Sequence, residues 1–430
     1  EAIYFYLKAL AEDHEFALGY VQLSFAQTTA QGFFKYFDKA KALIDNVSEG
    51  ERLWIMAIEA GFNGDPTQQR EYLKNIVKLY PDDERAENIL ATQYYGFQEY
   101  ELAIPHYKRA IEINPDYSQP YNQLGYCYRF LGKYEEARSA FNTYIDLIPE
   151  DPNPYDSFAE LLLITGEYDE SIEYYHKALN QKQTFIPSYI GIATNLNIMG
   201  QHAAAREHLN EALDVAETFG QERQIYQSII ISYIDEMDTV NALSTIEHLI
   251  TIDKEHDDLV SLSNDYNNKG NILLFVAGES DKALKFYEKS VDLIQSTDLS
   301  QEIKYNAKWG LMGTASQVFI MKGDYDVADK YIEKFSHYAE KAENPFQIMF
   351  SHQLKGMLAL YTSSYEEAIT EFENANQQNP LIHFWTAQAY ENLGDNNLAQ
   401  EYYRRAAFAN SLNNVPYAYI RQRAVSRITE

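Results

Sequence analysis

Cysteine is almost missing from this sequence, since Cys127 is the only one in 430 residues. A single thiol excludes a disulfide framework and a cysteine zinc cluster, although it does not separate a reducing from an oxidising compartment. Proline and glycine are also sparse, at 12 and 19 residues, which excludes a linker-rich or low-complexity chain. With a hydrophobic fraction of 46%, we expect a folded protein with a packed interior.

Positive charge is scarce as well. The chain has 35 Lys and Arg against 64 Asp and Glu, a formal net charge of -29. This charge repels phosphate backbones, and no Lys/Arg-rich stripe interrupts it, so neither nucleic acid nor an anionic membrane surface is an expected partner. Basic or neutral polypeptides fit better. No run of 18 apolar residues occurs, so no transmembrane segment is expected.

The sequence does not settle the compartment. The first residues, from Glu1 on, lack an initiator Met and the basic-then-apolar order of a signal peptide. The default expectation is cytoplasmic. A periplasmic or lipid-anchored extracytoplasmic protein is the alternative if a signal was removed before Glu1.

Enzymatic motifs are missing too. No H-E-x-x-H, C-x-x-C, P-loop, G-x-S-x-G or EF-hand pattern occurs. His202 and His208, six residues apart, fall on different helix faces and are expected at the surface. Cys127, between two tyrosines, is expected to be a small packing residue, because no His or Lys is spaced to activate it. We therefore expect no catalytic residue, no metal site, no cofactor and no small-molecule ligand.

What the sequence does contain is a repeat of 34 residues. Three series keep this step in one phase. They are Pro81, Pro115 and Pro149; Gly132, Gly166 and Gly200; and Ala103, Ala137, Ser171 and Ala205. Agreement between independent series predicts one supersecondary unit per step.

Each unit reads as two amphipathic helices. In residues 118–151, one face of a first helix carries apolar and small residues at i, i+3, i+4 and i+7, namely Tyr121, Leu124, Gly125 and Tyr128. A break at Gly132 precedes a second helix, which Pro149 ends. Gly125 is expected to let the two helix backbones approach closely.

The letters Y-N-Q-L-G-Y-C-Y-R-F-L-G-K-Y-E-E-A-R-S-A-F of residues 121–141 resemble the tetratricopeptide repeat. Residues 84–117 and 152–185 repeat the pattern, and 50–83 and 186–219 follow more weakly. The resemblance, to arrays of the bacterial type, implies an all-α fold: an α-solenoid of antiparallel helix hairpins coiled into a right-handed superhelix.

Three regions are expected along the chain. Residues 1–219 form a regular array that starts inside a repeat and keeps the strict period from about residue 50. Residues 220–413 hold looser repeats with longer loops, giving about ten hairpins in all. Residues 414–430 form a C-terminal capping helix that exposes Arg421, Arg423 and Arg427.

The resemblance also implies where a partner binds, because the first helices of the hairpins line the concave surface in this family. Ten residues of these helices are expected to lie off the packing face. They are Asn88, Thr92, Tyr95, Asn122, Tyr126, Arg129, Asp156, Glu160, Thr194 and Asn197. The family's clamp for a chaperone's C-terminal carboxylate needs basic residues at phases that here carry polar uncharged ones, so chaperone-tail binding is not expected.

Asn88 and Asn122 share one phase, and Asp156 follows in the same phase. Their side chains could form a ladder that bonds the backbone of an extended peptide, or they could be solvated groove residues. Both interpretations stay open at this point.

The sequence thus favours a non-catalytic scaffold or adaptor that binds a protein or peptide in its concave groove. The alternative is a sensing or docking region of a larger enzyme or transcription regulator whose N-terminal module is missing from this chain. A hydrolase built on the array itself would need clustered titratable residues that the spacing does not provide.

Overall fold

The computed structural model describes residues 2–27 and 29–428, and within these ranges every regular element is a helix. The first half comprises α1 (Ala2–Glu12), α2 (Ala17–Phe25), α3 (Ala30–Ala42), the 3-10 helix η1 (Ile44–Asn46), α4 (Glu49–Phe62), α5 (Pro66–Leu79), α6 (Glu84–Gly96), α7 (Tyr100–Ile113), α8 (Ser118–Phe130), α9 (Tyr134–Leu147), α10 (Pro152–Thr165), α11 (Tyr168–Gln181), α12 (Ile186–Ile198) and α13 (His202–Val215).

The second half continues without an interruption. It comprises α14 (Phe219–Asp235), α15 (Thr239–Glu255), α16 (Leu259–Asn271), the π-helix η2 (Ile272–Val276), α17 (Ser280–Ser296), α18 (Gln301–Lys322), α19 (Tyr325–Ala342), α20 (Pro345–Tyr361), α21 (Tyr365–Glu373), α22 (Pro380–Leu393), α23 (Asn396–Ala407) and α24 (Val415–Val425).

Local sequence signals set these boundaries. Ser48 and Glu51 form the capping box that starts α4, in which each side chain accepts a hydrogen bond from the backbone N–H of the other residue. Gly166 ends α10 in the left-handed conformation, at φ 85°, which costs glycine nothing. Proline follows within three residues of the ends of α5, α7 and α9, where it cannot continue the helix.

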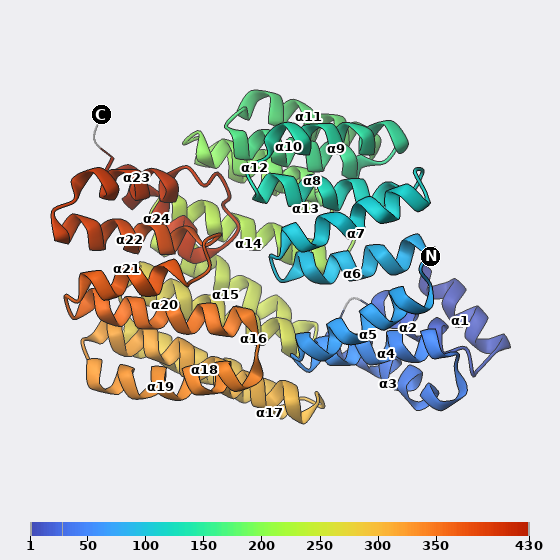
Figure 1. Cartoon of the computed structure of the whole chain (residues 1–430). Coiled ribbons are helices and arrows are strands. Elements are labelled where there is room, and N and C mark those ends of the chain that lie inside the picture. Colours follow the sequence, from blue (N-terminus) through green and yellow to red (C-terminus); the bar gives the residue numbers. More distant parts are fainter. Residues whose placement is uncertain (1, 28, 429–430) are drawn as a thin grey trace.

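Sequential helices from α2 to α23 pair as antiparallel hairpins, and each hairpin packs on the next (Figure 1). Gly125 permits this closeness in one hairpin, because a Cβ there would come within 2.6 Å of the Phe141 ring. One core position repeats at every 34-residue step and is almost fully buried each time: Tyr107, Phe141, Tyr175 and Leu209 are 0%, 0%, 1% and 0% exposed. The predicted all-α solenoid of helix hairpins is confirmed.

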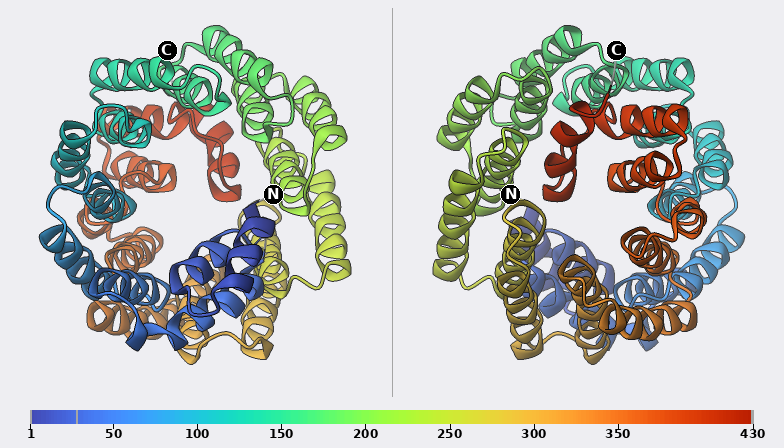
Figure 2. Two further views of the ribbon diagram at one scale, coloured as in Figure 1. Left: turned by 90° about the vertical axis from the view of Figure 1, so that its right-hand side faces the viewer. Right: turned by 90° about the vertical axis from the view of Figure 1, so that its left-hand side faces the viewer.

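Seen after a 90° turn from the view of Figure 1, the hairpins surround an open centre, so the array resembles a ring in projection (Figure 2). Hydrogen bonds then join segments that lie one coil apart. Asn306 Nδ2 in α18 donates to the carbonyl of Asn63, 243 residues earlier, and Asn410 Nδ2 donates to the carbonyl of Ile164, 246 residues earlier. Since Asn63 follows α4 and Asn306 lies in α18, one full turn takes about seven hairpins.

The looser period of the second half comes from longer helices. Helices α14, α15, α17 and α20 have 17 residues each and α18 has 22, against 13 or 14 in α4–α13. Most connections there stay at two to four residues. The expected longer loops occur before α22 and α24, at residues 374–379 and 408–414, and elsewhere extra turns of helix lengthen a unit without breaking its hairpin.

Helix α24 closes the array by packing against α14 and α22. Arg421 is buried rather than exposed, since its Nη1 lies 3.0 and 2.9 Å from the two carboxylate oxygens of Asp235 and its Nη2 donates to the carbonyl of Ile198. This corrects the expectation that Arg421 is exposed, because the side chain pairs with the buried carboxylate of Asp235. Arg423 is partly buried, and Arg427 is exposed as expected.

The same network corrects the expectation for two histidines. His202 Nε2 lies 2.9 Å from Asp235, and the side chain of His202 is 11% exposed. The side chain of His208 is 16% exposed and contacts Glu211 and the Tyr189 ring. Neither is a surface histidine, because His202 at the start of α13 contacts α14 of the following hairpin, and His208 in the middle of α13 packs on Tyr189 of α12.

Candidate functional site

The concave face of α8, α10 and α12 carries a groove of about 420 Å³. Arg129, Glu160 and Thr194, three of the ten predicted residues, line it from these three helices. The opposite wall is the chain's own segment 410–413, between α23 and α24. We call this hollow the concave groove.

The segment 410–413 is held in the concave groove by polar and apolar contacts. The Asn410 side chain donates to the Ile164 carbonyl at 3.3 Å and accepts from the Tyr168 hydroxyl at 3.1 Å. Asn410 and Leu412 are each 6% exposed. Part of the concave surface is thus already covered by polypeptide in an irregular conformation.

Arg129 is the only cation on this part of the groove wall, and its position is closely fixed. Its guanidinium lies 4.7 Å from the ring centres of both Tyr126 and Phe130, and Nη1 donates to Glu160 Oε2 at 2.9 Å. Its side chain is 12% exposed. The ion pair neutralises the charge of Arg129, so the groove offers a polar and nearly neutral surface.

Four of the predicted residues do not lie off the packing face. Asn88, Asn122, Asp156 and Asn197 are 3%, 8%, 5% and 3% exposed. The reason is visible at Asp156, whose carboxylate accepts from Ser188 Oγ in α12 at 2.6 Å. These positions on the first helix of a hairpin face the first helix of the next hairpin. The spacing in the sequence had predicted that they face the groove.

Burial also changes the chemistry of three of these residues. The Oδ1 atoms of Asn88 and Asn122 have no partner among the described residues, and both are inaccessible. Burial, and next to it the charge of Glu160, raises the pKa of Asp156 to about 7. The ladder of Asn88, Asn122 and Asp156 stays a prediction as a binding feature, and all three side chains are buried.

The other predicted residues divide between several surroundings. Thr92 is exposed and, with Asn88, borders a second, mostly apolar hollow of about 660 Å³ on the N-terminal hairpins. Tyr95 packs edge to face with Tyr100, at 5.5 Å between ring centres. Tyr126 donates to Ser157 Oγ at 3.2 Å, and Thr194 donates to the carbonyl of Ile190. The ten residues therefore do not form a single site.

A larger cavity, of about 960 Å³, lies between the two coils, and the sequence did not reveal it. We call it the chamber. Arg129 also borders it, but carboxamides dominate its wall, and Asp, Glu and Lys do not occur in it. The eleven carboxamide residues are Gln98, Asn267, Asn271, Gln317, Gln353, Asn376, Gln377, Gln378, Asn379, Asn413 and Asn414.

Some of these carboxamides bond within the protein and others do not. Gln378 Nε2 donates to the Tyr100 hydroxyl at 2.6 Å, which joins the two coils, and Asn379 Nδ2 donates to Gln353 Oε1 at 3.3 Å. Asn267 and Gln317 have no side-chain partner among the described residues. A signal was present in the sequence, because N-A-N-Q-Q-N at 374–379 is dense in carboxamides.

No group of three or more His, Cys, Asp or Glu side chains among the described residues is arranged to hold a metal ion. None of the helices in residues 2–27 and 29–428 combines the length and apolar character that crossing a membrane requires.

The fold defines a protein of stacked helical hairpins, an α-solenoid with a concave face. Family models described as tetratricopeptide repeat match residues 106–139 in one case, and 56–118 and 354–414 in another. The chain therefore contains tetratricopeptide repeats within these matched segments. This repeat family is generally a non-catalytic fold for protein interaction.

Several solved structures resemble the chain at low identity. A tetratricopeptide repeat protein from Parabacteroides merdae ATCC 43184 is 17% identical, with a TM-score of 0.42 over 63% of this chain and 99% of that one. MamA from residue 41 to its end, from Desulfovibrio magneticus RS-1, is 14% identical, with a TM-score of 0.34 over 39% and 96%. YrrB, described as a tetratricopeptide protein with an unusual peptide-binding site, is 15% identical, with a TM-score of 0.29 over 43% and 93%. The search of curated proteins found no match.

Proposed function

We propose that this protein is a non-catalytic scaffold that binds an extended, uncharged polypeptide segment along the chamber and the adjoining concave groove. The observation that carries the proposal is the composition of the chamber wall, with eleven carboxamides and no carboxylate in a chain of net charge -29. A wall of this kind departs strongly from the rest of the protein.

Carboxamides suit a polypeptide backbone because each one presents a donor and an acceptor, as each peptide group does. Backbone recognition of this kind gives affinity without strict sequence specificity. The carboxamide of Asn410 already bonds a main-chain carbonyl in this way, at Ile164. The same interaction with a foreign segment would use the unpartnered side chains of Asn267 and Gln317.

The charge of the chamber wall limits the kind of segment that is expected to bind. Arg129 and Arg405, the cations of the chamber, are paired with Glu160 and Glu401. A segment rich in Lys or Arg would find no carboxylate on this wall, and a strongly acidic one would be repelled by the protein as a whole. A neutral, polar segment is the expected partner.

Selection from a random library of 12-residue peptides against the whole chain tests the proposal. Enriched peptides are then titrated calorimetrically against the double variant Asn267→Leu with Gln317→Met, which keeps the side-chain size but removes the hydrogen-bonding groups. We expect the dissociation constant to rise about tenfold or more, since each lost hydrogen bond costs ~0.5–1.5 kcal/mol.

The matched control is Asn142→Leu, which removes an exposed carboxamide from α9 on the outer side of the array. This variant should bind the enriched peptides as the parent protein does. An equal affinity for the parent and the double variant, at unchanged melting temperature, would exclude the chamber as the binding site. Failure to enrich any peptide would contradict the proposed function itself.

A further inference from the structure

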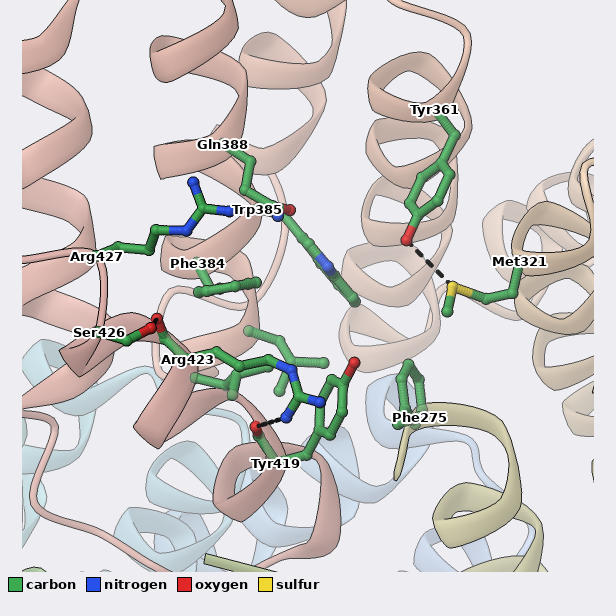
Figure 3. Close-up of a pocket in the computed structure, with 12 residues that line it drawn as sticks. Phe275, Met321, Tyr361, Phe384, Trp385, Gln388, Tyr419, Arg423, Ser426 and Arg427 are labelled. Carbon is green, nitrogen blue, oxygen red and sulfur yellow. Dashed lines mark hydrogen bonds between the residues drawn. The ribbon is translucent and has the colours of Figure 1, made fainter. Parts of the chain in front are cut away.

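A separate pocket of about 360 Å³ lies under the C-terminal helix (Figure 3). It is formed where η2, α18, α20, α22 and α24 meet. Five aromatic rings contribute to its wall, those of Phe275, Tyr361, Phe384, Trp385 and Tyr419. Its volume is at the small end of the range for pockets that bind organic ligands, which is roughly 300–1,000 Å³.

Arg423 brings a positive charge to this pocket in a fixed orientation. Its guanidinium lies 3.7 Å from the centre of the Tyr419 ring, and Nη1 donates to the Tyr419 carbonyl at 2.9 Å (Figure 3). The stacked ring covers one face of the guanidinium. Its Nε and Nη2 have no acceptor among the described residues, so two donors remain for a ligand.

The lack of a carboxylate beside Arg423 is exceptional in this chain. Among the described residues, and Arg404 aside, every other arginine forms an ion pair with Asp or Glu. Two of them are close to Arg423 in sequence: Arg421, on the same helix, pairs with Asp235, and Arg427, just after the end of that helix, pairs with Glu391. In a chain with 64 acidic and 35 basic residues, a partner would have been easy to supply.

The pocket wall contains no acidic residue at all. Its charged members are Arg423 and Arg427. Since most of the other wall residues are apolar or aromatic, an anion entering the pocket would leave water for a surface of lower dielectric constant, where its attraction to a guanidinium is stronger than in solution. The pocket therefore combines a flat apolar surface with a positive charge at its edge.

We propose that this pocket binds a small organic anion with a flat apolar body and a carboxylate. The rings bury the apolar body, and the free edge of Arg423 pairs with the carboxylate through Nε and Nη2, the fork geometry that guanidinium groups use for carboxylates. The indole N–H of Trp385 and the Gln388 carboxamide, both without a partner among the described residues, are further polar groups on the wall.

This site adjoins the chamber, since Phe275 and Leu381 line both, but its two arginines and its other four aromatic rings do not line the chamber. A ligand here would differ from the sequence-based expectation of no small-molecule ligand. Two sources share the chemistry: a free aromatic acid, and the C-terminal carboxylate of a peptide that ends in an aromatic residue. The volume of the pocket admits either one as a single ring system with its carboxylate.

Calorimetric titration of the whole chain with 2-naphthoate and with the neutral 2-naphthamide tests the inference. We expect 2-naphthoate to bind at least about tenfold more tightly, because only the anion forms a charge-assisted pair. Quenching of tryptophan fluorescence, which includes that of Trp385 in the wall, provides a second readout. Equal affinities for the two ligands, or no binding of either at millimolar concentration, would overturn the inference.

Variants locate the binding. Arg423→Gln should lower the affinity for 2-naphthoate to that for 2-naphthamide, and Arg423→Lys should give an intermediate value. The control Arg52→Gln removes an exposed arginine of α4, paired with Glu49, and should change nothing. Unchanged 2-naphthoate binding by Arg423→Gln would contradict the site. Arg423 is only partly buried, so these variants should fold.

Competition distinguishes the two sources. A short peptide ending in Phe, with a free or an amidated C-terminus, is added to the complex with 2-naphthoate. Displacement by the free-acid peptide alone assigns the pocket to chain ends. No displacement by either peptide assigns it to free aromatic acids. Displacement by both forms would contradict the role of the carboxylate.

Discussion

Nη1 of Arg421 lies 3.0 and 2.9 Å from the two carboxylate oxygens of Asp235, a residue 186 positions earlier in the chain. Both side chains are buried, and His202 lies 2.9 Å from the same carboxylate. This contact fastens α24 to α14. It couples the end of the array to its middle.

Breaking this pair should loosen α24. Arg421→Met leaves the Asp235 carboxylate buried beside His202 alone, and removing one partner of a buried pair costs ~3–5 kcal/mol. Hydrogen exchange of the α24 amides should report the lower opening free energy. The matched control is Arg427→Met, whose pair with Glu391 is exposed and is worth less than ~1 kcal/mol. Equal protection of α24 in both variants would contradict this prediction.

The pKa of Asp156, raised to about 7 by burial, makes stability depend on pH. The pKa of Asp156 is higher in the folded state than in the unfolded state. The stability that comes from its protonated carboxyl group is therefore fully present below about pH 4 and is lost as pH rises through about 7. Asp156→Asn should therefore stabilise the protein at pH 8, by roughly 2–4 kcal/mol, and have little effect at pH 4. Melting temperatures across this range check the sign, with the exposed Glu150→Gln as control.

Two glycine substitutions should have opposite effects. A Cβ at Gly191 would come within 2.1 Å of the Tyr175 ring, so Gly191→Ala should destabilise the protein by ~1–3 kcal/mol. Gly310 is inside α18 with nothing within 4 Å of its would-be Cβ, so Gly310→Ala should stabilise it by ~0.5–1 kcal/mol. Denaturant unfolding measures both. A stabilising Gly191→Ala would mean that the helices are not as close as described.

The thiol of Cys127 should not react in the native protein. It is 0% exposed, and burial raises its pKa to about 12, so the thiolate is almost absent at neutral pH. A thiol reagent should label one equivalent in denaturant and essentially none before unfolding. Rapid native labelling would contradict the packing role that the sequence predicted for Cys127.

The contact between coils should control the overall dimensions. Phe97 stacks on Phe346 at 5.5 Å between ring centres, and Gln378 bonds the hydroxyl of Tyr100. Replacing Phe97 and Gln378 with Ala should let the coils separate, so the radius of gyration in small-angle X-ray scattering should increase while helical circular dichroism persists. The control Phe408→Ala removes an exposed ring. No change in scattering would mean that hairpin packing alone sets the pitch.

The hairpins and their core could be predicted because their causes are local. Gly125 against Phe141 follows from one repeat unit, and so does the capping box of Ser48 and Glu51. The burial of Asn122 and Asp156 could not be predicted, because their helix phase is fixed by how the next hairpin is rotated on the previous one. The periodicity of residues within one helix carries no information about the rotation between neighbouring hairpins.

The chamber, the pocket of Arg423 and the burial of Arg421 were out of reach for a related reason. Gln378 meets Tyr100 across 278 residues, and Arg421 meets Asp235 across 186. Such contacts depend on how many hairpins make a full turn of the superhelix. That number follows from the small rotation between neighbouring hairpins, added up over the whole turn. The total rotation decides which residues of the two coils face each other, and the sequence of a single repeat does not determine it.

Those contacts between coils also bear on how the protein responds to force. A solenoid whose coils are separate extends gradually, as a spring does. Here the second coil rests on the first, through the hydrogen bonds from Asn306 to Asn63 and from Asn410 to Ile164. When the two ends are pulled apart, these bonds must break before the hairpins between residues 63 and 410 carry the full load. The array should therefore be stiff at first and then yield abruptly.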